Sequence, residues 1–327
     1  MFQIHEVSRA TGEIVRVQLK RAKFLAYFVN RPPCVIGMEA CGGAYHWARE
    51  LIALGHAVKL LPPQKVRPFA AGNKNDVADA QAIWTAMQQP GMKAVAVKTE
   101  SQQAVLAMHR MRTQLVKFRT AQVNALRGLF GEYGEVMPVG RLSAMKAIPE
   151  VLGRLEDRLP TVLIETLREQ FQRIHDLDGQ VLMIEQRLKQ WFEMEPECQR
   201  IAAIPGVGLL SATAAVATIG DPATFRSGRE FAAWLGLVPR QVGTGGRVKL
   251  LGISKRGDTY LRTLLIHGAR AVLARNKTPS PWVARLCERR PQNVVVVAMA
   301  NKMARTLWAL MAHQRTYLAN YAGAEVL

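Results

Sequence analysis

The sequence predicts an α/β domain followed by helices (fold class α/β plus α), on three observations. Short apolar runs alternate with helical segments over the first 97 residues. Two long amphipathic segments come next. The remainder combines helical patterns with a large excess of Lys and Arg. With 327 residues, 49% of them hydrophobic, the chain can build two or three cores. We therefore expect three parts, residues 1–97, 98–195 and 196–327.

The first part reads as two strands followed by strands that alternate with helices. The strands show period-two alternation or short buried apolar runs, and glycines or prolines bound them. This order is typical of a mixed α/β sheet. The expected strands are residues 2–7, 14–19, 34–39 and 57–61, and the expected helices end near Val29 and Leu54.

Three carboxylates mark a candidate metal site in this part. Glu39 closes an apolar strand, and Asp76 and Asp79 open a helix that runs to about Met87. Their i, i+3 spacing places both aspartates on one helical face. Acids are also favoured in the first turn of any helix by its dipole. The addition of Glu39 favours a site for Mg²⁺ or Mn²⁺, and two such ions can activate and stabilise the oxygens of a phosphodiester.

Cations near these acids could hold phosphate groups beside the metals. The residues concerned are Lys59, Lys65, Arg67 and Lys74.

The middle part predicts two long helices. Apolar residues recur at helical spacing over residues 102–130 and again over residues 167–191. The stretch between them is rich in Gly and Pro and predicts a loop or a loosely helical connector. This pattern indicates an antiparallel coiled-coil arm or a dimerisation element, and a plain helical core fits it equally well.

The last part begins with a glycine turn, residues 204–208 (Ile-Pro-Gly-Val-Gly), before an Ala-rich helix. It has the form of a helix-hairpin-helix turn, in which Gly206 and Gly208 would present backbone N–H groups to a phosphate. A simple glycine turn between packed helices is the alternative. The basic sequence downstream favours the nucleic-acid contact.

A basic, glycine-rich segment follows, residues 243–246, which we expect to be a flexible loop. Arg240, Arg247 and Lys249 flank it, and Thr244 supplies one hydroxyl. Taken alone, these residues predict a phosphate-contacting loop rather than a nucleophile, because a hydroxyl nucleophile needs activation.

Residues 254–258 (Ser-Lys-Arg-Gly-Asp) read as a helix cap that carries Lys255 and Arg256 toward phosphates. From residue 240 to the end, 15 Lys and Arg stand against three acids, in a chain of net charge +19. Such a field favours polyanions as partners.

Four cysteines without a CxxC pair indicate buried, reduced thiols and a cytoplasmic protein. We find no signal peptide and no apolar run of about 18 residues, so we expect no membrane partner.

With these motifs assembled, the chain resembles the DEDD transposases of the insertion-sequence 110/1111 family over nearly its whole length. The resemblance implies an RNase H-like, resolvase-type N-terminal domain, a coiled-coil arm and a mostly helical C-terminal transposase domain. It also implies DNA strand exchange that excises and inserts a mobile element, a structured guide RNA, and a dimer or tetramer in the bacterial cytoplasm, near the nucleoid. The matching segments are residues 2–5, 36–42, 72–80, 204–208, 235–240 and 252–258.

By this resemblance Glu39, Asp76 and Asp79 match the second, third and fourth acids of the tetrad. Thr244 matches the position of a serine that attacks DNA, and Ser254 is a less fitting substitute. The family's first acid would precede Met1, so we expect either a start codon set too late, which we favour, or a truncated copy. A junction-resolving nuclease and an inactive nucleic-acid-binding remnant are the alternative functions.

Overall fold

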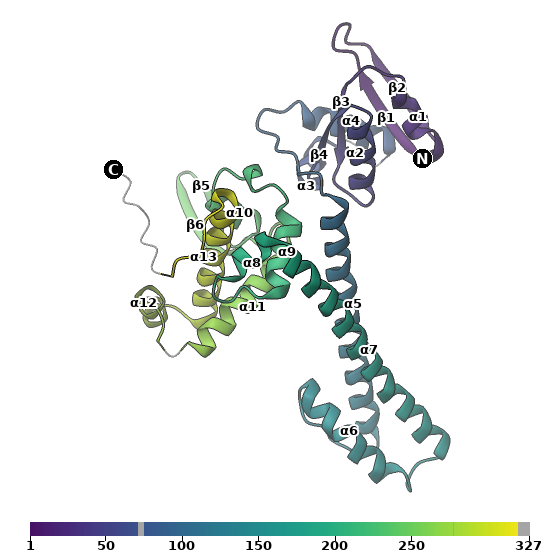
Figure 1. Ribbon diagram of the computed structural model, residues 1–327, viewed down its shortest axis with the longest axis vertical. Coiled ribbons are helices and arrows are strands. Elements are labelled where there is room, and N and C mark those ends of the chain that lie inside the picture. Colours follow the sequence, from purple (N-terminus) through teal and green to yellow (C-terminus); the bar gives the residue numbers. More distant parts are fainter. Residues whose placement is uncertain (71–74, 277, 320–327) are drawn as a thin grey trace. The chain divides into compact units, whose positions relative to one another are not determined.

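The computed structural model describes residues 1–70, 75–276 and 278–319 (Figure 1). Within these residues the fold is mostly helical, with small sheets. The chain divides into two compact units, which we describe separately. The first comprises residues 1–99 and 219–226, and the second comprises residues 100–218 and 227–327.

The strands of the first unit form two separate two-stranded sheets. Strands β1 (Phe2–Val7) and β2 (Ile14–Leu19) form an antiparallel pair. Strands β3 (Val35–Glu39) and β4 (Ala57–Leu61) form a parallel pair, and helix α2 (Ala44–Ala53) connects them. The sequence predicts one mixed sheet. Among the described residues no strand joins β1 to β3. Each named strand pairs with one other named strand, and β4 makes one further bridge, between Leu60 and Val95.

Strand β3 faces a different layer on each side. Ile36 and Met38 pack into a core built by the aromatic side chains of α1 (Phe24–Val29) and by α2. Gly37 points the opposite way, because a Cβ there would lie 2.7 Å from Met87 Sδ and 3.3 Å from Ile83 Cγ2 of α4 (Asp76–Met87). The helices that complete this unit are α1 (Phe24–Val29), α3 (Pro63–Val66) and α4 (Asp76–Met87), with 3-10 turns η1 (Arg21–Lys23), η2 (Arg67–Phe69) and η3 (Pro222–Thr224).

Two long antiparallel helices begin the second unit (Figure 1). Their direction follows from two ion pairs, Arg112–Glu185 at 2.6 Å and Arg119–Asp178, because the residue numbers rise on one helix as they fall on the other. The coiled-coil interpretation of this pair stays a prediction. The helices are α5 (Glu100–Glu132) and α7 (Thr161–Met194).

A third helix, α6 (Arg141–Leu155), occupies the connector that the sequence predicts as a loop or loosely helical segment. Pro149 lies inside it, at the loss of one backbone hydrogen bond. Ile148 and Leu152 on α6 are buried in one cluster with Phe130 and Ile174 of the two long helices. This burial at helical spacing outweighs the cost of the proline.

Most of the other helices of the second unit pack against α13 (Gln292–His313). By length and composition α13 could cross a membrane, so the sequence-based expectation that no such run exists is wrong. Half of its apolar window is buried, as in the core helix of a compact unit. The elements not yet named are α8 (Pro196–Ala202), α9 (Leu209–Ile219), α10 (Gly228–Trp234), α11 (Thr259–Arg275), α12 (Pro281–Arg289), β5 (Pro239–Thr244) and β6 (Arg247–Ile253).

The glycine turn between α8 and α9 is a type II turn. The Val207 N–H donates to the Ile204 carbonyl at 2.9 Å, and Gly206 has φ +87°. A Cβ at Gly206 would lie 2.8 Å from the Gly268 carbonyl oxygen, and one at Gly268 would lie 2.1 Å from that of Gly206. The turn therefore packs backbone against backbone on helix α11.

We predict that Gly206→Ala lowers the free energy of unfolding by about 2 kcal/mol or more, because it adds both left-handed strain and a steric clash. Gly208→Ala is the matched control, since a Cβ there has no neighbour within 4 Å. Urea denaturation of both variants measures the difference. Equal stabilities would contradict the packing described here.

Candidate active site

Glu39 lies at the C-terminal end of β3, where it pairs with Leu61 and is half-buried. Side chains alternate between the two faces of a strand, so Glu39 projects to the same face as Gly37. That face is the one covered by α4. The Glu39 carboxylate therefore lies on the face of the sheet that is covered by α4, the helix that carries the two aspartates.

Asp76 and Asp79 lie in the first turn of α4, as the sequence predicts. Asn75 caps the helix: its Oδ1 accepts a hydrogen bond from the Ala78 N–H at 2.8 Å, and its carbonyl accepts from the Asp79 N–H at 3.0 Å. The cap fixes where the helix begins and so which face the aspartates share. The helix dipole stabilises both acids at this position.

The three carboxylates do not form a metal-ligand group. Among the described residues no three His, Cys, Asp or Glu side chains lie close enough to hold a metal ion. Oxygen donors suit a hard cation, but Glu39, Asp76 and Asp79 do not make up such a group in this structure. Lys74, predicted to hold phosphate, lies outside the described residues.

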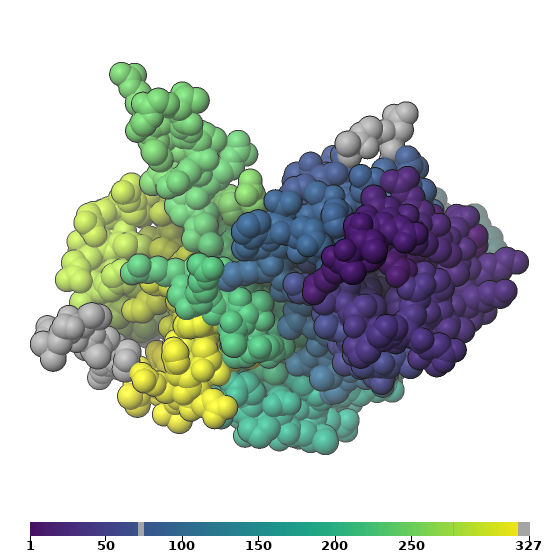
Figure 2. Space-filling model, turned by 90° about the horizontal axis from the view of Figure 1, so that it is seen from above, coloured from purple at the N-terminus to yellow at the C-terminus, as the bar shows by residue number. Residues whose placement is uncertain are grey.

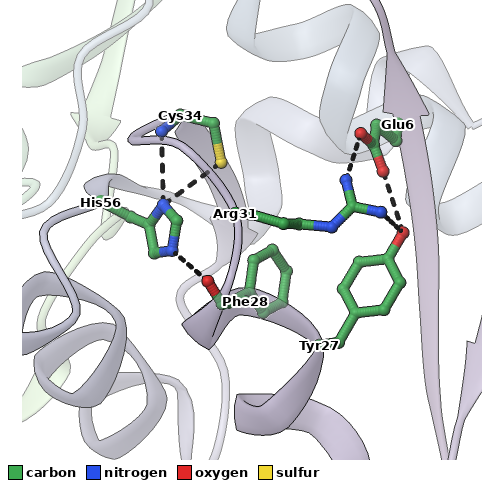
Figure 3. Close-up of polar contacts among 6 residues, drawn as sticks. All are labelled: Glu6, Tyr27, Phe28, Arg31, Cys34 and His56. Atoms are coloured by element: carbon green, nitrogen blue, oxygen red, sulfur yellow. Dashed lines mark hydrogen bonds and ion pairs between the residues drawn. The ribbon is translucent and has the colours of Figure 1, made fainter.

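Glu6, the first acid of the chain, is held by hydrogen bonds from two neighbouring side chains (Figure 3). Its carboxylate accepts from Arg31 Nη1 at 2.5 Å and from the Tyr27 hydroxyl at 2.9 Å, and Arg31 also donates to that hydroxyl at 2.7 Å. Burial, followed by the hydrogen bond to Glu6, raises the pKa of Tyr27. Glu6 therefore has a structural role: its hydrogen bonds join β1 to α1 and the segment that follows it.

Cys34 and His56 form a pair that could be mistaken for a catalytic dyad (Figure 3). His56 Nε2 lies 3.2 Å from the Phe28 carbonyl, which can only accept, so Nε2 carries the proton. Nδ1 then accepts from the Cys34 N–H at 3.3 Å, with the sulfur 3.4 Å away. Burial and the charge of Glu6 raise the pKa of the Cys34 thiol, so it is no activated nucleophile.

The cysteines differ from the sequence-based expectation of buried thiols. Only Cys198 is buried as a whole residue; Cys34, Cys41 and Cys287 are exposed, because they lie at strand ends, loops and a helix surface. The Cys34 sulfur is nevertheless partly shielded beside His56. All four are free of disulfide bonds.

The basic segment around Thr244 is a β-hairpin, not the flexible loop that the sequence predicts. Gly245 and Gly246 form a two-residue turn with φ +56° and +77°, as in a type I′ turn. This turn matches the twist of paired strands, so it closes β5 onto β6. The hairpin is exposed and stands out from the helices of its own unit (Figure 2).

The hairpin register gives it two different faces. Thr244 lies opposite Arg247, and Val242 lies opposite Lys249, so these four side chains share one face. Thr244 is therefore flanked by two cations. In the described part of the chain its hydroxyl makes no hydrogen bond, so activation of this hydroxyl requires a group from elsewhere.

Arg262 fixes the root of the hairpin. This buried guanidinium, only 6% exposed, donates to the Leu235 carbonyl at 2.9 Å, to the Arg256 carbonyl at 2.7 Å and to Thr259 Oγ1 at 3.0 Å. A Cβ on Gly257 would lie 1.8 Å from the Trp234 carbonyl oxygen. The segments that enter and leave the hairpin are thus held in one geometry.

Residues 254–258 confirm the predicted helix cap. Asp258 Oδ1 accepts from the Leu261 N–H at 2.7 Å at the start of α11. Lys255 and Arg256 are exposed beside it. The Ser254 hydroxyl oxygen is buried without a hydrogen-bond partner, so Ser254 is poorly placed to attack a substrate.

The two glycines predicted to contact phosphate have different surroundings. Gly206 packs on α11, which agrees with the alternative interpretation of a packed turn. Gly208 is exposed immediately before α9, where the N–H groups of a helix N-terminus are available to an anion.

A buried polar network around His109 was missed in the sequence, where this residue has no visible partner. Its Nε2 lies 3.0 Å from Thr213 Oγ1, whose proton goes to the Leu209 carbonyl, so Nε2 carries the ring proton. Its Nδ1 accepts from the Tyr260 hydroxyl at 2.9 Å. Burial, with a smaller effect of Arg112, lowers the pKa of His109 to about 4. The network joins α5, α9 and α11 through a neutral imidazole.

Comparisons with known proteins agree with the motifs. Residues 198–282 match a family described as "Transposase IS116/IS110/IS902 family", and residues 16–134 match a family described as "Transposase", of the DEDD type. A probable family 20 transposase of Pseudomonas aeruginosa is 48% identical, over 97% of this chain and 95% of its own length. The transposase for insertion sequence element IS1111A of Coxiella burnetii is 40% identical, over 97% of this chain and 88% of its own length. The transposase for insertion sequence element IS1328 of Yersinia enterocolitica is 39% identical, over 94% of this chain and 93% of its own length.

We predict that His109 makes the protein less stable in acid. The pKa of His109 is about 4 in the folded protein and 6.5 in the unfolded chain. The neutral imidazole therefore contributes its full stabilisation of the folded state above pH 6.5, and this contribution is lost as the pH falls toward 4. The loss between pH 7 and 4.5 should be roughly 2–3 kcal/mol. Denaturant unfolding at several pH values measures it. His109→Gln, which cannot titrate, should show a shallower dependence, and parallel curves would contradict the assignment.

Proposed function

The chain belongs to the IS116/IS110/IS902 family of transposases, and we propose that it excises and inserts a mobile element by cutting and rejoining DNA strands. The observation that carries the proposal is its 48% identity to a probable transposase across nearly the whole of both chains. Family membership implies DNA as a partner and DNA-cleaving activity. A structured RNA from the element, which selects the DNA target, is part of the proposal.

The domain organisation that we propose follows the predicted boundaries. Residues 1–97 would form an RNase H-like domain, supported by the parallel β3–α2–β4 unit with α4 on its other face. Residues 98–195 would form the coiled-coil arm, supported by the antiparallel pair α5 and α7. Residues 196–327 would form the nucleic-acid-binding domain, supported by its basic hairpin and its glycine turn.

Thr244 is our candidate nucleophile. Its hydroxyl would lose a proton as its oxygen bonds to phosphorus, and a deoxyribose oxygen of the DNA would leave with a proton, giving a transient protein–DNA ester. Arg247 and Lys249, on the same face of the hairpin, would stabilise the negative charge on the phosphate. The threonine methyl group crowds the approach and should slow attack relative to serine.

Glu39, Asp76 and Asp79 remain our candidates for the acidic part of the site. The DEDD family suggests that a divalent metal is used, and Mg²⁺ or Mn²⁺ is the ion that carboxylates favour. The three carboxylates do not form one metal-binding group among the described residues, so we assign no catalytic step to a metal.

The exposed cations are our candidates for DNA contact. They can pair with backbone phosphates, which fixes position without reading sequence. We further propose a homo-oligomer, a dimer or tetramer, that acts on DNA at the bacterial nucleoid. The residues proposed to contact nucleic acid are Arg240, Arg247, Lys249, Lys255 and Arg256, with the backbone of Gly208.

We predict that Thr244→Ala abolishes the covalent protein–DNA adduct and lowers strand transfer about 10³-fold or more, because it removes the attacking oxygen. Thr244→Ser should match or exceed the parent rate. Denaturing gels of protein mixed with end-labelled element DNA measure the adduct, with Thr166→Ala, an exposed threonine on α7, as the matched control.

Continued cutting by Thr244→Ala with no adduct in any variant would instead favour a water-using, junction-resolving nuclease. Loss of all cutting in every form, the parent included, would favour the inactive remnant.

We predict weak metal binding by the protein without DNA, with a Kd for Mn²⁺ of about 1 mM or higher, because its carboxylates do not converge on one ion. Electron paramagnetic resonance of free Mn²⁺ measures this binding. Micromolar binding that is lost in Asp79→Asn but kept in Asp157→Asn, an exposed aspartate beyond α6, would contradict the separated geometry.

A further inference from the structure

A cavity of about 180 Å³ lies where α5 meets the start of α6, within the second unit. It is separate from the residues to which the proposed function assigns roles. Its walls come from one face of α5 and from the first residues of α6. The lining residues are Thr120, Val123, Asn124, Arg127, Gly140 and Arg141.

Arg127 leaves a hydrogen-bond donor unused in this wall. Its Nη1 donates to Asn124 Oδ1 at 3.2 Å and its Nη2 to the Pro138 carbonyl at 3.2 Å. Its Nε is buried and has no hydrogen-bond partner. A buried donor attached to a positive charge is costly to leave unpaired. The charge of this guanidinium is met by neutral acceptors alone, so the wall of the cavity can still gain an anion.

The charge around the cavity is positive. Arg141 Nη1 lies 2.8 Å from Asp178 Oδ2, and the other oxygen of that carboxylate pairs with Arg119. One carboxylate therefore serves two arginines, while Arg127 has only neutral acceptors. The buried Nε of Arg119 also lacks a partner.

The remaining polar groups add further donors. Because the Asn124 oxygen accepts from Arg127, its amide nitrogen is left to donate. Gly140 has no side chain to cap α6, so the first-turn N–H groups of this 15-residue helix have no side-chain acceptor. Arginine forks and backbone N–H groups together are the usual ligands of phosphate oxygens.

We propose that this cavity is a phosphate site. Arg127, Arg141 and the Asn124 amide bind the oxygens of one phosphate, and the start of α6 adds its N–H groups. The phosphate is either an ester in a nucleic-acid backbone or a free ion, and both present the same oxygens. The helical region formed by α5, α6 and α7 would thus have a phosphate-binding site that is distant in sequence from the hairpin.

The decisive variant is Asn124→Asp. Aspartate keeps the oxygen that accepts from Arg127, so the local structure is retained, but it replaces the donor with a second negative oxygen. Arg127→Gln removes the main cation, and Arg110→Gln, an exposed position on the same helix, is the matched control. Thermal unfolding establishes that each full-length variant is folded.

The first experiment titrates inorganic phosphate into each protein and follows ³¹P NMR shifts or calorimetric heat. The proposal expects binding that is weakened at least about tenfold by Asn124→Asp and by Arg127→Gln and unchanged by Arg110→Gln. The second titrates a DNA or RNA oligonucleotide at several salt concentrations. A backbone phosphate in the cavity would lower the salt slope by about one in the same two variants.

Loss of phosphate binding with an unchanged oligonucleotide slope assigns the cavity to a free phosphate. A lowered slope assigns it to nucleic acid. If Asn124→Asp and Arg127→Gln behave like Arg110→Gln in both titrations, the proposal is overturned.

Discussion

The buried guanidinium of Arg262 is the interaction on which the C-terminal surface depends. A charge removed from water requires hydrogen bonds to offset its desolvation. Here Leu235 and Arg256 supply carbonyl oxygens from the two sides of the hairpin root, and Thr259 supplies a third oxygen. The hairpin itself is exposed along its length and has no core. Its direction is therefore set at its base, and the positions of Thr244 and its flanking cations follow from that base.

The sequence predicted the elements whose signals are local. Asn75, Asp76 and Asp79 mark the start of α4, and the apolar spacing of α5 and α7 reveals both helices, because caps and periodicity act within a few residues. Helix α6, predicted as a loop or a loosely helical connector, and the hairpin, predicted as a flexible loop, were not recognised for different reasons. Pro149 reads as a breaker until the burial of Ile148 and Leu152 is known, and two glycines in a row read equally as a loop or as a tight turn.

The candidate site shows the same limit. Alternation along β3 and the turn of α4 determine the faces on which Glu39, Asp76 and Asp79 lie, but the spacing between those faces depends on how helix and sheet pack. The partners of His109, at positions 213 and 260, are more than 100 residues away in the chain. No pattern in a single sequence connects such positions.

The hairpin also bears on how the protein behaves at high concentration. Val248 and Leu250 are 65% and 61% exposed on β6, a strand that is an edge of its sheet. Such an apolar edge invites pairing with the same edge of another molecule. Arg247 and Lys249 alternate with these side chains and act as gatekeepers, since like charges repel when two copies approach. Concentrated salt screens that repulsion. At high salt, aggregation of this chain should therefore begin at the β5–β6 hairpin, which also carries its candidate nucleophile.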